Sequence, residues 1–137
     1  MESKNKTILV TASAKRLGKF IAIDLIKKGW KVAIHYNKSK ILAEDTADYL
    51  FKIGGNVSTH QADLTCNSDI EKLVNEIEAQ DSKWVGLINN AGYFNYDDGN
   101  NFRAEELHRH MSVNFIAPTL LTKALAKHTM KMKKQEN

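Results

Sequence analysis

The stretch from Ile8 to Gly18 constrains the fold of this chain most strongly. A short apolar run, typical of a buried β-strand, leads into a tight loop of small residues with two adjacent cations, Lys15 and Arg16. A helix follows, with one apolar face expected at Leu17, Ile21 and Leu25. Such a loop exposes the unpaired N–H groups of a helix N-terminus, where the helix dipole is positive. The sequence therefore predicts a phosphate-binding turn between a strand and a helix.

Strand and helix patterns alternate along the rest of the chain. Apolar β runs are expected at residues 7–10, 31–35, 56–61 and 84–88, and helices at 18–28, 41–53, 68–77 and 104–132. The apolar stripe of the second helix is expected at Leu42, Tyr49, Leu50 and Ile53. This alternation is typical of parallel strands joined by right-handed crossovers. The predicted fold is α/β, a Rossmann-like doubly wound parallel sheet in a single partial dinucleotide-binding domain, residues 1–137, truncated after four strands and the long fourth-crossover helix.

Composition disfavours several other classes of protein. The 137 residues are 42% hydrophobic, which suits one α/β core, and the net charge is only +4. This mild excess suits an anionic small molecule, because a nucleic-acid site would depend on the basic tail alone, at Lys127, Lys131, Lys133 and Lys134. Cys66 is the only cysteine, no apolar run is long enough for a bilayer, and residues 1–6 lack a signal-peptide core. We expect a soluble cytoplasmic protein that binds neither nucleic acid nor membrane.

Four short motifs occur in a characteristic order and spacing: Thr11–Gly18, Asp63-Leu64, Asn89–Gly92 and Ser112–Asn114. On these motifs the chain resembles the short-chain dehydrogenase/reductase family, and it corresponds to the N-terminal, cofactor-binding half of a family member. The turn, together with His35–Ser39, looks most like the pteridine-reductase branch. The resemblance implies an oxidoreductase that reduces a carbonyl or a pterin by hydride transfer from a dinucleotide.

The resemblance also implies which residues surround the cofactor. Thr11 would brace the turn through its hydroxyl, and Gly18 would let the first helix pack closely on the sheet. Asp63 would bond the adenine amino group, and Leu64 would cover the adenine ring. The implied cofactor-binding set is Thr11, Ser13, Lys15, Arg16, Leu17, His35, Tyr36, Asn37, Lys38, Ser39, Asp63, Leu64, Asn90, Ala91 and Gly92.

The end of the second strand discriminates between NAD and NADP. A dinucleotide fold that prefers NAD usually has an acid there, which bonds the ribose 2′-OH and repels a 2′-phosphate. Tyr36 holds that position, and no acid occurs from Gly29 to Ala43. Donors and cations are available instead, at His35, Asn37, Lys38, Ser39, Lys15 and Arg16. Lys38 and Lys40 would also fit an ordinary solvated turn, but the missing acid favours NADP(H).

Asn114 and Pro118 form a second informative pair. Proline has no N–H, so the Asn114 carbonyl lacks its usual helical partner four residues on. The resemblance implies a catalytic role for Asn114, whose carbonyl would hold a water of a proton relay at a local kink. A simpler interpretation is that Pro118 bends a long helix around the core, and both can hold together.

Two features depart from the family pattern. Ala12 stands where the first glycine of the turn is expected, and its methyl group could crowd the cofactor. The family's catalytic serine and Tyr-x-x-x-Lys also have no counterpart, because no tyrosine follows Asn114. Tyr36 and Lys40 have that spacing but lie on the turn after the second strand. We therefore expect no complete catalytic site in these residues.

Three further expectations concern partners and other functions. The fourth strand would form an apolar sheet edge, and the long helix is a dimer surface in the family, so a homo-oligomer or a second chain supplying the missing half is expected. A noncatalytic dinucleotide-binding or interaction module is the alternative function. No metal site is expected, because His108 and His110 lie two residues apart and point to different helix faces.

Overall fold

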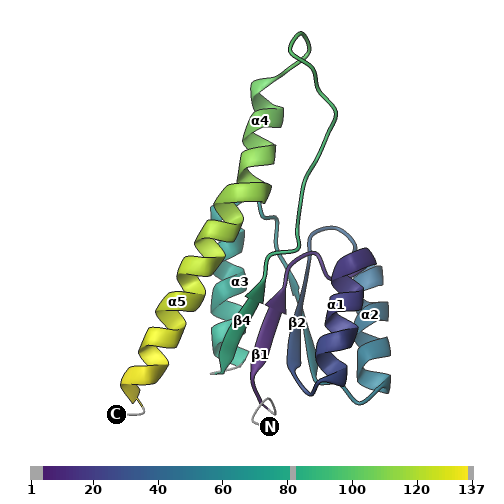
Figure 1. Ribbon diagram of the computed structural model, residues 1–137, viewed down its shortest axis with the longest axis vertical. Coiled ribbons are helices and arrows are strands. Elements are labelled where there is room, and N and C mark those ends of the chain that lie inside the picture. Colours follow the sequence, from purple (N-terminus) through teal and green to yellow (C-terminus); the bar gives the residue numbers. More distant parts are fainter. Residues whose placement is uncertain (1–4, 81–82, 136–137) are drawn as a thin grey trace.

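The computed structural model describes residues 5–80 and 83–135, and Figure 1 shows their arrangement. Residues 1–4, part of the segment expected to lack a signal peptide, lie outside the described residues. The elements in chain order are β1 (Thr7–Val10), α1 (Arg16–Lys27), β2 (Lys31–Tyr36), α2 (Lys40–Lys52), β3 (Val57–Gln61), α3 (Asn67–Gln80), β4 (Trp84–Ile88), α4 (Ala104–Met111), the π-helical segment η1 (Ser112–Ile116) and α5 (Ala117–Gln135).

The four strands form one parallel sheet in the order β3-β2-β1-β4. Alternate residues of β1 face opposite layers: Leu9 packs in a core with α3 and α5, and Val10 packs in a core with α1 and α2. Figure 1 shows the two helical layers on either side of the sheet. The chain runs outward from β1 through β2 to β3, and α3 then carries it back across the sheet to β4 on the other side of β1, so the strand order reverses between β1 and β4. The predicted doubly wound parallel fold is confirmed.

The predicted apolar faces of the first two helices are confirmed only in part: Ile21 and Leu25 pack against the core and Leu50 is fully buried, but the other predicted residues are exposed. On α1 the buried residues are Gly18, Ala22 and Ile26, and Leu17 is 65% exposed. On α2 they are Ala43, Thr46 and Leu50, whereas Leu42, Tyr49 and Ile53 remain partly exposed. Small residues let both helices lie close to the sheet, and the Thr46 hydroxyl donates a hydrogen bond of 2.7 Å to the Ala14 carbonyl. Close approach of the backbones therefore outweighed burial of the largest side chains.

The last helical stretch is continuous but changes its winding. Residues 104–135 are helical, as the pattern predicted for 104–132, and η1 separates α4 from α5. Pro118 follows η1 closely and cannot donate a helical N–H, which accounts for a wider turn at this point. Figure 1 shows α4 and the loop before it rising beyond the carboxyl ends of the strands. No helix within residues 5–80 and 83–135 is both long and apolar enough to cross a membrane.

Candidate dinucleotide-binding site

The β1–α1 turn has an unusual backbone. Ala12 has φ +50° and Arg16 has φ +53°, which are left-handed values that favour glycine. Ser13 is fully buried, its hydroxyl donates to the Val10 carbonyl at 2.7 Å, and its N–H donates to the His35 carbonyl at 3.0 Å. The predicted close packing at Gly18 is confirmed, because a Cβ there would lie 2.7 Å from Nδ2 of Asn90. The turn is folded tightly against β2 and the end of β4.

Thr11 and Asn90 join this turn to the segment after β4. The Thr11 hydroxyl oxygen accepts hydrogen bonds from the N–H groups of Asn90 at 3.0 Å and Ala91 at 2.9 Å. The Asn90 side-chain amide donates to the carbonyls of Thr11 and Ala12 at 3.1 and 3.2 Å. The predicted bracing role of Thr11 is confirmed. These contacts fix the ends of β1 and β4 together at the point where the strand order reverses, which is where open α/β sheets bind ligands.

His35 positions the turn from β2. Its side chain is 2% exposed, and its Nδ1 accepts the N–H of Ala12 at 3.0 Å, so the proton of the neutral ring lies on Nε2. Nε2 then donates to the Ala62 carbonyl at 3.0 Å. Burial lowers the pKa of His35, which favours this neutral form. The expectation that the imidazole supplies a donor to a ligand is wrong, because both ring nitrogens are bonded to backbone groups.

A cavity of about 370 Å³ lies at the carboxyl edge of the sheet. It gathers residues from the ends of all four strands, and six of the predicted cofactor contacts line it besides His35: Asn37, Lys38, Asp63, Leu64, Ala91 and Gly92. A neighbouring cavity of about 280 Å³ shares Ala12, Asn37 and Lys38 with the first. It adds three more predicted contacts at the β1–α1 turn and the end of β2: Lys15, Tyr36 and Ser39. The structure thus brings together residues that are distant in sequence along one continuous edge.

Five predicted contacts line neither cavity: Thr11 and Asn90, which join the turn to the segment after β4, and Ser13, Arg16 and Leu17. Ser13 lies within the turn but is fully buried with its hydroxyl bonded to the Val10 carbonyl, so its contact with a cofactor stays a prediction. Arg16 and Leu17 are exposed at the start of α1, and neither lines the two cavities. Both still flank the turn from its outer side, next to Lys15.

The cavity is also lined by Tyr93, which follows the Asn89–Gly92 motif and which the sequence suggested as a pocket residue, and by three residues that it did not indicate: Thr65, Arg109 and Val113. The Arg109 guanidinium lies 5.4 Å from the centre of the Tyr93 ring. Hydrogen bonds from Thr65 lower the pKa of the Asp63 carboxyl, and the charges of Lys38 and Arg109 lower it further. The i, i+4 spacing of Arg109 and Val113 places them on one helix face, but only the fold shows that this face points toward Asp63.

Asn114 fastens η1 to the loop after β4. Its Oδ1 accepts the N–H of Tyr93 at 2.7 Å, and its Nδ2 donates to the carbonyl of Tyr93, also at 2.7 Å. The Tyr93 hydroxyl donates to Oε2 of Glu106 on α4 at 2.8 Å. The Asn114 side chain therefore acts as a clamp: it holds the backbone of Tyr93, which lines the cavity.

Comparison with known proteins identifies the family that this arrangement belongs to. A family model described as short chain dehydrogenase matches residues 6–137, which is nearly the whole chain. The chain belongs to the short-chain dehydrogenase/reductase family. It is 35% identical over 91 residues to the short-chain dehydrogenase/reductase homolog YusS of Bacillus subtilis, a match that covers 66% of this chain and 84% of that protein.

Solved structures of the family superpose closely on this chain. A short-chain dehydrogenase/reductase from Serratia marcescens matches with a TM-score of 0.88 at 24% identity, covering 93% of this chain and 52% of its own. The FolM alternative dihydrofolate reductase 1 from Brucella canis, complexed with NADP, matches with a TM-score of 0.83 at 32% identity, again covering 93% and 52%. The chain thus spans about half the length of these solved relatives.

Proposed function

We propose that this chain is the NADP(H)-binding part of a short-chain dehydrogenase/reductase-like oxidoreductase. The observation that carries the proposal is the cavity at the end of β2, where Lys15, Lys38 and Ser39 line one wall and no acid lies between residues 29 and 43. Two cations and a hydroxyl match a 2′-phosphate. The NADP in the Brucella canis relative supports the same preference.

The other contacts with the dinucleotide would come from residues along both cavities. Asp63 and Leu64 would take the adenine, as the family resemblance implies, and the backbone of Ala91 and Gly92 would approach the nicotinamide side. In the larger cavity Arg109, next to Tyr93, is a cation in addition to Lys38. A bound dinucleotide would supply the hydride for reduction of a carbonyl. The chain's own residues would bind and orient it at the edge of the sheet.

The substrate and the state of assembly belong to the same proposal. In the intact family the reaction is carbonyl or pterin reduction, and the dihydrofolate reductase name of the Brucella relative favours a pterin. Because the 137 residues hold no counterpart of the family's serine and Tyr-x-x-x-Lys, we propose that they bind the cofactor without turnover unless a second chain completes the site. A noncatalytic dinucleotide-binding module is the second candidate, favoured by the same absence.

Titration with NADPH and NADH, followed by nicotinamide fluorescence, tests the proposal. We expect NADPH to bind more tightly than NADH. Lys38→Ala should weaken NADPH at least about tenfold with little effect on NADH, because about 1.4 kcal/mol of charge pairing is lost. Lys40→Ala is the matched control, since Lys40 lies outside both cavities and pairs with Glu44. Failure to bind either nucleotide contradicts the proposal, and tighter binding of NADH contradicts the 2′-phosphate site.

Turnover separates the two candidate functions. If the chain is part of an oxidoreductase, a pterin should be reduced when a second chain supplies the missing groups. If it is a noncatalytic module, it should bind the dinucleotide without any reduction. Measurable reduction by this chain by itself would contradict the inference that its catalytic site is incomplete.

A further inference from the structure

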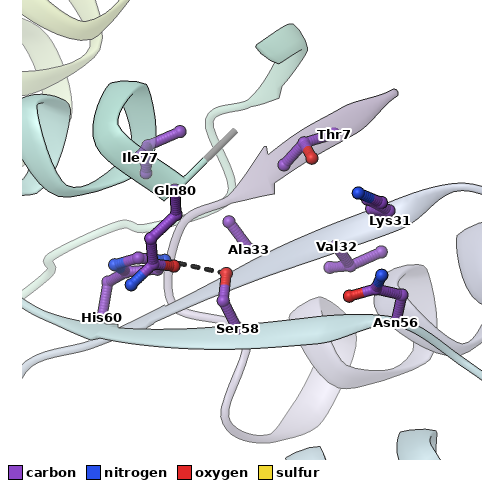
Figure 2. Close-up of a pocket in the computed structure, with 9 residues that line it drawn as sticks. All are labelled: Thr7, Lys31, Val32, Ala33, Asn56, Ser58, His60, Ile77 and Gln80. Carbon is purple, nitrogen blue, oxygen red and sulfur yellow. Dashed lines mark hydrogen bonds between the residues drawn. The ribbon is translucent and has the colours of Figure 1, made fainter. Parts of the chain in front are cut away.

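A small cavity lies at the opposite end of the sheet from the dinucleotide site. Its volume is about 90 Å³, and it opens between the beginnings of β1, β2 and β3 and the C-terminal end of α3 (Figure 2). Its polar lining consists of Thr7, Lys31, Asn56, Ser58, His60 and Gln80. Cofactor binding at the carboxyl edge makes no use of these groups.

Two of the side chains that line this cavity, Ser58 and His60, form a hydrogen-bonded chain with Glu76 behind them. Ser58 and His60 are two residues apart on β3, so their side chains lie on the same face of the sheet. The Ser58 hydroxyl lies 2.8 Å from Nε2 of His60, as the dashed line in Figure 2 shows. Nδ1 of His60 lies 3.1 Å from Oε2 of Glu76, which comes from α3. His60 is 2% exposed, and Ser58 is half-buried and lines the cavity.

The carboxylate determines the direction of these hydrogen bonds. An ionised Glu76 only accepts, so the proton of the neutral His60 ring lies on Nδ1. Nε2 is then an acceptor, and the Ser58 hydroxyl donates to it. Serine, histidine and acid in this order are the arrangement that activates a serine oxygen, whatever the fold that carries it. We propose that Ser58 is a nucleophile that accepts short acyl groups from activated esters.

The proposed reaction is an ester hydrolysis in two halves. Ser58 Oγ bonds to the ester carbonyl carbon while its proton passes to Nε2 of His60, and Glu76 stabilises the resulting imidazolium. The bond from that carbon to the leaving oxygen then breaks, and the leaving group takes the proton from His60. A water attacks the acyl-serine and gives its proton to His60, which returns it to Ser58 as the acid leaves. The net change is ester plus water to acid plus alcohol.

The cavity limits the acyl group and offers a place for the developing charge. A volume of about 90 Å³ has room for an acetyl group but cannot enclose a long acyl chain. The Lys31 ammonium and the Asn56 amide line the same cavity as the hydroxyl and carry N–H donors. Such donors can stabilise the negative oxygen of the tetrahedral intermediate.

Acetylation of the full chain by 4-nitrophenyl acetate tests the proposal, with peptide mass mapping to locate the acetyl group. We expect acetyl-Ser58 in the wild type, none at this peptide in Ser58→Ala, and a rate at least about 100-fold lower in His60→Gln. The Glu76→Gln variant keeps an acceptor but loses the charge, so the rate should fall at least about tenfold. Ser68→Ala, an exposed serine at the start of α3, is the matched control and should react as the wild type does. The octanoyl ester should label Ser58 more slowly, because the cavity cannot enclose its chain.

Three results would overturn the proposal. The first is that acetyl groups are found only on lysines or on residues other than Ser58. The second is that Ser58 is labelled at the wild-type rate in both His60→Gln and Glu76→Gln. The third is that the octanoyl ester labels Ser58 as fast as the acetyl ester does. Because His60 is buried, its variant needs a thermal melt, and the more exposed Glu76 keeps the test valid if that variant unfolds. NADPH titration of Ser58→Ala separates this proposal from cofactor binding, which should be unchanged.

Discussion

Ala12 combines a strained backbone with a central place in the cofactor turn. Its φ of +50° is a left-handed backbone conformation, which costs a residue with a Cβ atom about 1–2 kcal/mol. We predict that Ala12→Gly raises the free energy of unfolding by roughly 0.5–1 kcal/mol, because glycine's greater unfolded-state entropy offsets part of the relief. Urea denaturation measures this. NADPH should also bind more tightly, because the turn can then approach the phosphates more closely.

A matched alanine in the same turn provides the control. Ala14 is 4% exposed and does not have a positive φ, so Ala14→Gly removes packing and relieves no strain. It should lower the free energy of unfolding. Equal destabilisation by both glycine variants would contradict the strain at Ala12.

His35 predicts a pH dependence of stability. Its pKa is lowered in the folded protein, whereas the unfolded chain should titrate near the ordinary value of about 6.5. Below that value the unfolded state binds more protons, so stability is complete above it and falls as the pH drops toward the folded pKa. We expect a contribution to the slope of at most about 1.4 kcal/mol per pH unit. Urea denaturation between pH 5 and 8 measures it, and His35→Asn should remove this contribution.

His108 is the control for that measurement, because it is exposed on α4. His108→Asn should keep the wild-type slope. A slope that survives in His35→Asn would show that a different group carries the pH dependence.

At the scale of elements, the Asn114 clamp predicts how the cavity wall is held. Asn114→Ala removes both 2.7 Å bonds to the backbone of Tyr93, so we expect a loss of about 1–3 kcal/mol in the free energy of unfolding. Hydrogen exchange at the Tyr93 amide should accelerate as the loop before α4 loosens. Asn101→Ala is the control, because its side chain bonds only Asp98 within that loop. Unchanged exchange at Tyr93 would show that the loop is held by other contacts, such as the bond from its hydroxyl to Glu106.

The elements themselves show what the sequence could predict. Their order and approximate bounds followed from local periodicity and glycine positions, for example Gly29 with φ +86° after α1. The buried faces of α1 and α2 did not, because side-chain size suggested Leu17 and Leu42 where the fold buries Gly18 and Ala43. The distance between a helix and a sheet is a tertiary quantity, and a single stretch of sequence does not contain it.

At the scale of the molecule, the alternation of strands and helices predicted a doubly wound parallel sheet, and the structure supplied the order of its strands. His35 and Ser13 lie at the candidate dinucleotide site as predicted, but their side chains bond to the backbone of the protein. Their hydrogen bonds to Ala12, Ala62 and Val10 depend on burial that only the folded chain provides. Arg109 was missed for the complementary reason, because α4 returns to the sheet only after a long loop.

Self-association is the prediction that belongs to the whole molecule. Large apolar side chains at intervals of four residues remain 44–61% exposed along the α4–α5 stretch, at Leu107, Met111 and Phe115. Such a surface is stable in water when a second copy covers it, and a standard interface needs about 800 Å² per partner. We expect light scattering to give the mass of a dimer, and Phe115→Glu to halve it, because a buried carboxylate without a partner is costly. Phe20→Glu on α1 is the control at an equally exposed position and should remain dimeric. A wild-type mass equal to one chain would contradict self-association through this surface.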